Sequence, residues 1–172
     1  RRQRQMCIRD RANSTEYGGD GVTPGFSSFV SDDLETFEGP FHAFDGGSGF
    51  WGEKAYWAPE VYKTGGAYYM FATFFSEEEG RRCQILKSDN PLTGFKPWSQ
   101  PITPAGWWCL DATLFFHEGK PYSVYCHEWL QVKNGEMWIT ELSPDFKSAV
   151  GEPKMLFRAL DAPWVPSWDD GN

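Results

Sequence analysis

The amino-acid sequence predicts an all-β fold and, within that class, part of a β-propeller. Short segments that alternate apolar and polar residues recur between clusters of Gly, Pro, Asn and Asp. The sequence shows no convincing helical period of 3.6 residues, so we expect little helix. Aromatic residues make up 17% of the chain, and their rings suit the half-buried surface of a pleated sheet.

The expected strands are bounded by turn residues and rich in aromatic or β-branched side chains. A strand, a tight turn at Gly65-Gly66 and an aromatic-rich strand follow one another, and the same order recurs around Gly119. The expected strands, in chain order, are residues 60–63, 67–75, 83–87, 112–116, 122–127 and 136–142.

A repeat of about 55 residues groups these strands into blades. Ser31, Ser88 and Ser143 each follow a strand and open a turn, and they are 57 and 55 residues apart. A second series, which aligns Glu60 with Thr113, is offset by 53 residues. Propeller blades of about four strands have periods in this range. We expect the end of one blade, two complete blades and the start of another, with a β-sandwich of coincidental turn spacing as the alternative.

Charge is unevenly distributed along the chain. Residues 1–11 hold five Arg and one Asp, which leaves 11 basic and 23 acidic residues in 12–172. Such an acidic body argues against nucleic acid and against an anionic membrane as partners. The sequence has no run of 18 apolar residues that could span a membrane. The four Cys match no zinc or redox motif, so we expect reduced, buried thiols, with one disulfide as the alternative.

Both ends of the sequence differ from the segments between them. Residues 1–11 lack the apolar core of a signal peptide and are expected to be a non-native or disordered tail. Residues 12–172 are then an incomplete propeller domain, whose last residues stop in a turn-rich polar stretch.

Three segments make residues from about 25 to 172, about 85% of the chain, similar to glycoside hydrolase family 43. They are Phe29-Val-Ser-Asp-Asp-Leu, Tyr56-Trp-Ala-Pro-Glu-Val and Leu110-Asp-Ala-Thr-Leu-Phe-Phe. The resemblance implies a five-bladed propeller that acts on arabinans, xylans and related glycans. On this basis we expect an inverting hydrolase of arabinofuranosyl or xylosyl linkages. A non-catalytic carbohydrate-binding propeller is the alternative, and a related five-bladed family that acts on fructans or mannosides is a weaker one.

The resemblance also implies three acidic groups at the propeller axis. Of these, only the third-blade Asp, which keeps the general acid protonated, maps onto this sequence, at Asp111. The general base is expected upstream of residue 12 and the general acid after Asn172, so we expect this chain alone to be inactive. Glu38-Gly-Pro repeats the letters of the general-acid motif, but it follows an outer-strand pattern and is expected at a blade's rim. The alternative for Asp111 is a carboxylate bonded to a turn backbone.

Residues beside the starts and ends of the inner strands are the substrate-binding candidates, since aromatic and polar groups line sugar pockets. Trp57 could stack on a sugar or pack between blades, and Glu60 could bind a hydroxyl or satisfy a buried amide. The candidates are Trp57, Glu60, Phe75, His127, Glu128 and Trp129. No cofactor is expected, since no cluster of metal ligands occurs. A structural cation such as calcium is implied only for the complete protein, and the expected partner is an oligo- or polysaccharide.

Overall fold

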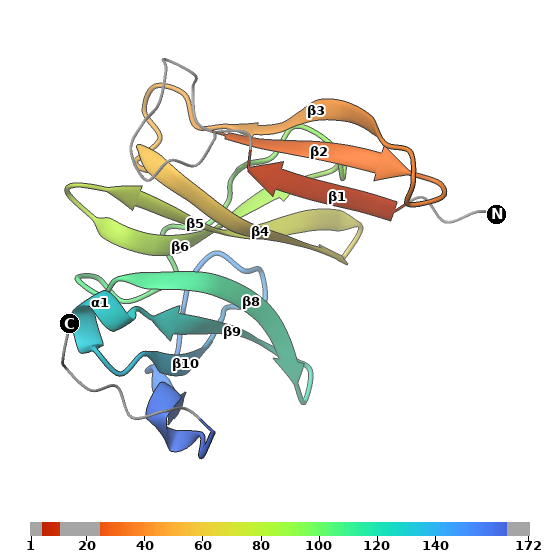
Figure 1. The fold of residues 1–172 in the computed structure, drawn as a ribbon. Helices are drawn as coiled ribbons and strands as arrows, with labels where there is room; N and C mark the ends of the chain where they lie inside the picture. Colours follow the sequence, from red (N-terminus) through yellow and green to blue (C-terminus); the bar gives the residue numbers. More distant parts are fainter. Residues whose placement is uncertain (1–4, 11–24, 165–172) are drawn as a thin grey trace.

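The computed structural model describes residues 5–10 and 25–164, which form three antiparallel sheets. Figure 1 shows these sheets following one another face to face along the chain. The first holds β1 (Gln5–Asp10), β2 (Gly25–Ser31) and β3 (Glu38–Asp45). The second holds β4 (Lys54–Thr64), β5 (Ala67–Ser76), β6 (Gly80–Ser88) and β7 (Lys96–Pro97). The third holds β8 (Cys109–His117), β9 (Lys120–His127), β10 (Glu136–Glu141) and β11 (Lys154–Arg158).

Helix within the described residues is limited to the one-turn α1 (Trp129–Val132) and the 3₁₀ turn η1 (Ala159–Asp161). In the second and third sheets, strand order follows chain order, β4-β5-β6-β7 and β8-β9-β10-β11. Four-stranded meanders of this kind, stacked face to face, are the blades of a propeller. The expected all-β class and partial propeller are confirmed, and the start of a further blade falls outside the described residues.

The 53-residue offset reflects two equivalent hairpins. The β4–β5 turn uses Gly65 and Gly66 at φ of 57° and 84°, and the β8–β9 turn uses Glu118 and Gly119 at 49° and 78°. Two successive positive φ angles define the tight turn whose twist matches paired strands. Glycine therefore suits three of these four positions, and Glu118 is the exception.

The serine series marks an equivalent turn in each sheet. The hydroxyls of Ser31, Ser88 and Ser143 each accept a hydrogen bond from a backbone N–H of the turn that follows. The donors are the amides of Leu34, Asn90 and Ser148, at 2.7, 3.0 and 3.1 Å. A short hydroxyl side chain at this position replaces the strand hydrogen bonds that end there.

Apolar side chains fill both spaces between the sheets. Between the first and second sheets, Phe74 is fully buried and its ring contacts those of Tyr56 and Phe50 at centroid distances of 4.8 and 4.9 Å. Between the second and third sheets, residues such as Phe71 and Tyr125 are fully buried. Each blade thus buries its faces only against its neighbours, which is why a single four-stranded sheet would not be stable alone.

Cys83, Cys109 and Cys126 carry free thiols, and the first two are buried. Burial raises the pKa of the Cys83 thiol to about 12, because the thiolate cannot be solvated there. The expectation of reduced thiols holds for these three residues, while the side chain of Cys7 lies outside the described part of the chain.

The structure differs from the expected tail at residues 5–10. Their backbone forms β1, which pairs with β2 so that Cys7 lies opposite Phe29. The non-native origin of residues 1–11 stays a prediction.

Candidate active site

Asp111 occupies a β-bulge in β8, the first strand of the third sheet. The register with β9 shifts between Leu110 and Thr113, and Asp111 has a φ of 55°. Its backbone N–H donates to Oγ1 of Thr73, 3.0 Å away on β5 of the second sheet. Thr73 is fully buried, so this bond anchors the bulge to the core of the neighbouring blade.

The second blade repeats the bulge at the equivalent place. In β4 the register shifts between Trp57 and Glu60, and Ala58 has a φ of 45°. Ala58 and Asp111 are 53 residues apart, the same offset as the two hairpins. Bulges commonly redirect a side chain near a functional site, and here the same device presents a methyl group in one blade and a carboxylate in the next.

The first strands β4 and β8 lie against each other in space. Thr113 Oγ1 donates a hydrogen bond of 2.7 Å to Glu60 Oε2, and the hydroxyl of Tyr62 binds the same carboxylate oxygen. The bond from Thr113 on β8 crosses to Glu60 on β4, so Glu60 helps to fasten the two blades together, whereas Tyr62 belongs to β4 like Glu60. Glu60 therefore has a structural role, but its partners are two side-chain hydroxyls and not the buried amide that was considered. A contact of Glu60 with a sugar stays a prediction.

Two nearby charges act on the carboxyl group of Asp111 in opposite directions. Partial burial raises the pKa of Asp111, and the negative charge of Glu60 raises it further. The positive charge of Arg81 lowers it. The net direction is upward, so Asp111 takes up a proton at a higher pH than an ordinary aspartate does.

Arg81 is a site residue that the sequence analysis missed. It lies on β6, is 6% exposed, and pairs through Nη1 with Oε2 of Glu128, which is also 6% exposed. Its guanidinium lies 4.3 Å from the centroid of the Trp57 ring. A signal was present in the sequence, because an Arg in a strand of otherwise buried residues needs a partner.

Trp57 and Phe75, the two candidate aromatic residues, lie beside this arginine. Both are half-buried, and the Arg81 guanidinium is 5.8 Å from the Phe75 centroid. Trp108, which was not a candidate, completes the group at 5.9 Å. The structure therefore brings Trp57, Phe75 and Glu128 together around one cation.

His127 and Glu128 are neighbours in sequence but contact different groups. The His127 ring stacks on Trp107 with centroids 4.4 Å apart, and its Nε2 lies 2.8 Å from Gln131 Oε1. Its Nδ1 is 3.5 Å from Glu136 Oε2. Trp129, by contrast, is 54% exposed at the start of α1. A sugar contact by His127 or by Trp129 stays a prediction.

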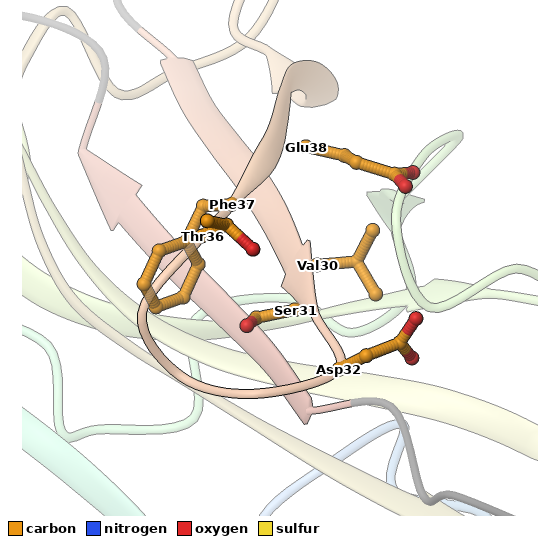
Figure 2. Close-up of a pocket in the computed structure, with 6 residues that line it drawn as sticks. All are labelled: Val30, Ser31, Asp32, Thr36, Phe37 and Glu38. Atoms are coloured by element: carbon orange, nitrogen blue, oxygen red, sulfur yellow. The ribbon is translucent and has the colours of Figure 1, made fainter.

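Glu38 lies on β3, the edge strand of the first sheet that corresponds to the outer strands β7 and β11. Figure 2 shows its side chain at a shallow pocket of the β2–β3 hairpin, lined also by Val30, Ser31, Asp32, Thr36 and Phe37. This is the rim position expected for a glutamate outside the catalytic group.

Among residues 25–164, His, Cys, Asp and Glu side chains form no group of three or more that could hold a metal ion. No helix in the same part of the chain is long and apolar enough to cross a membrane.

Comparison with known proteins identifies the family to which this chain belongs. A search of curated proteins gave no match. Among solved structures, an endo-arabinase from Bacteroides thetaiotaomicron VPI-5482 is 36% identical with a TM-score of 0.83, and the match covers 96% of this chain and 56% of that one. A thermostable family-43 glycoside hydrolase is 25% identical with a TM-score of 0.70, covering 78% and 46%.

An endo-1,4-beta-xylanase from the same Bacteroides strain is 26% identical with a TM-score of 0.61, covering 77% of this chain and 43% of that chain. This chain therefore spans about half the length of the solved structures that it matches. The family model described as glycosyl hydrolases family 43 matches residues 11–169. With nearly its whole length matched by that model, the chain belongs to glycosyl hydrolase family 43.

Proposed function

We propose that the complete protein containing these blades is a glycosidase that hydrolyses arabinofuranosyl or xylosyl linkages of plant polysaccharides with inversion. Membership of family 43 supports the reaction class. The similarity to an endo-arabinase and to an endo-1,4-beta-xylanase supports the two linkage types.

The single observation that carries this proposal is the placement of Asp111. Asp111 lies in a bulge of β8, a strand that contacts β4 of the preceding blade, and its backbone is fixed to Thr73. Propeller enzymes assemble their sites where the first strands of successive blades converge. The equivalent bulge at Ala58 has the same left-handed backbone without a carboxylate, so the bulge is a feature of the blades and Asp111 supplies the functional group at this position.

Asp111 acts in this proposal on the protonation of another group. Inverting hydrolysis uses one protonated and one ionised carboxyl group, about 6.5–9.5 Å apart, with a water molecule between the base and the sugar. A third carboxylate beside the general acid disfavours ionisation of that acid, which stays protonated closer to neutral pH. The general base and general acid belong to the other blades, so the chain of 172 residues alone is expected to be inactive.

Aromatic side chains near Asp111 would bind the glycan. Trp57 and Phe75 are half-buried beside Arg81, so each side chain keeps part of its surface exposed. Trp129 is more exposed and suits a contact with a sugar unit further along the polysaccharide. Ring faces of this kind exclude water and hold the sugar's apolar face.

The test is an assay of the complete protein on aryl arabinofuranosides, aryl xylosides, linear arabinan and xylan. We expect turnover on at least one of them with inverted product configuration by NMR. Asp111→Asn should lower kcat on the order of 10²-fold or more with little change in stability. Glu38→Gln is the matched control. Glu38 lies in a Glu-Gly-Pro segment like the general-acid motif but at the rim of a blade, so this variant should keep normal activity.

Each result has a definite meaning. A folded protein without turnover on any of these substrates would contradict the glycosidase proposal and favour a carbohydrate-binding propeller. An Asp111→Asn variant with normal kcat would remove Asp111 from the site. A loss of activity in Glu38→Gln would show that the rim position was misjudged.

A further inference from the structure

We propose that Arg81 is a positioning residue for Asp111 and Trp57, and that the role of Glu128 is to hold Arg81 in place rather than to bind sugar. The inference rests on the proposed function for its kinetic consequences. Its geometry is independent of that function, because the pair joins two blades and Arg81 lies two residues along β6 from Cys83, which is paired with the Thr73 that holds the bulge of Asp111.

The ion pair joins two sheets and is buried. Arg81 belongs to β6 of the second sheet, and Glu128 follows β9 in the third. Both side chains are only 7% exposed. The backbone N–H of Glu128 donates to the carbonyl of Trp108 at 2.8 Å, which fixes the point from which its carboxylate reaches Arg81. The pair therefore joins two residues that are 47 positions apart in the sequence and belong to different blades.

Aromatic rings fix the guanidinium on its other sides. Its Cζ lies 4.3 Å from the Trp57 centroid and 5.8 and 5.9 Å from those of Phe75 and Trp108. A planar cation over an indole face is attracted by the ring's quadrupole, and the attraction grows when water is excluded. Within the described residues Arg81 Nε is buried without a hydrogen-bond partner, so Glu128 and the rings set its orientation.

This arrangement has a consequence for Trp57. One face of its indole is occupied by Arg81, so a sugar could use only the other face or the edge. The position of Trp57 then depends on the pair, since its ring is held by the guanidinium that Glu128 anchors. Loss of the pair should loosen Trp57 even if the fold persists.

The electrostatic surroundings of Asp111 give the second consequence. The groups that interact with it are Glu60 from β4, Arg81 and Cys83 from β6 and Cys126 from β9, while Glu128 just after β9 pairs with Arg81. Arg81 is the cation of this set, and its charge favours the ionised carboxylate. Without it, partial burial and Glu60 would both act to protonate Asp111.

Stability alone does not account for such a pair. Replacing a buried ion pair by well-packed apolar residues is often neutral or stabilising, whereas removing one partner leaves an unpaired buried charge. A double variant can therefore separate the two roles. It keeps the fold while it removes the cation that acts on Asp111.

The experiment uses Arg81→Met combined with Glu128→Leu in the complete protein. Carboxyl ¹³C NMR follows the titration of Asp111, assigned by the loss of its signal in Asp111→Asn, and kcat is measured against pH on an aryl glycoside. We expect a melting temperature close to that of the parent, an upward shift of the Asp111 titration, and a matching upward shift of the acidic limb of kcat. Weaker orientation of Trp57 should raise KM as well.

Two further variants keep the test decisive. Arg81→Gln with Glu128→Gln removes both charges while two amides can still pair, and it serves if the apolar double variant does not fold. Arg81→Lys keeps the cation but not its planar fork, so the Asp111 titration should stay near the parent's while KM rises.

An unchanged Asp111 titration in a folded double variant overturns the inference, whether or not the parent is active. An upward NMR shift in a protein that hydrolyses no glycoside upholds the positioning of Asp111 and refutes the proposed function instead. A shift of equal size in Arg81→Lys would also overturn the inference, because the charge would then not be its cause.

Discussion

The hydrogen bond between the Asp111 backbone and the Thr73 side chain offers the sharpest test of how the bulge is held. Thr73→Val removes the hydroxyl acceptor and keeps the branched shape of a fully buried side chain. The variant leaves the Asp111 carboxylate itself untouched. Any effect on catalysis must then come from its placement.

The size of the effect follows from two free-energy contributions. Loss of this part-buried bond costs about 1 kcal/mol, the low end of the range for an unsatisfied buried donor. The left-handed conformation of Asp111 stores up to about 2 kcal/mol more, which the bond helps to hold. If only the first contribution is lost from the transition state, kcat falls about 5-fold, and if both are lost it falls about 150-fold.

The assay is kcat of the complete protein on its best aryl glycoside, with Thr73→Ser as the matched control because serine keeps the acceptor. We expect Thr73→Ser to stay within a few-fold of the parent and Thr73→Val to fall by the amounts above. Equal rates for parent and Thr73→Val, with both proteins folded, would refute the argument that this bond places Asp111.

Two other predictions concern the charge and the packing around the site. Glu60→Gln removes a negative charge that raises the pKa of Asp111, so that pKa should fall and the acidic limb of kcat should move to lower pH; an upward movement would contradict the sign of this interaction. Gly80→Ala places a methyl group 2.6 Å from Nε1 of Trp108 at a φ of 71°, and it should lower both stability and substrate affinity. Gly65→Ala, at a φ of 57° with open space around it, carries the conformational strain without the clash and should leave KM unchanged. Equal KM values for the two alanine variants would show that Trp108 plays no part in binding.

Local sequence was enough to predict β4 to β6, β8 to β10 and their grouping into blades, but not β1, β3, β7 and β11. The residues that set the turns, such as Gly65-Gly66 and the three serines, act through their own backbone and nearest neighbours. Their spacing therefore appears directly in the sequence as a repeat. The motif around Asp111 was also readable, because it is a short continuous segment.

The sequence predicted that the segments at Ala58 and Asp111 are equivalent, but it did not predict their bulges. The 53-residue offset aligned the two segments, but the positive φ angles and the bond to Thr73 depend on how one sheet packs on the next. Alternation of apolar residues carries no information on such a shift in register.

By itself, the sequence determined the all-β class, the blade period and the family resemblance, since each arises from residues close together in the chain. Only the tertiary structure decided what surrounds Asp111. Arg81 and Glu128 lie 47 residues apart and meet only because two blades stack. Burial makes their charges matter, and burial is a property of the packed blades that no stretch of sequence contains on its own.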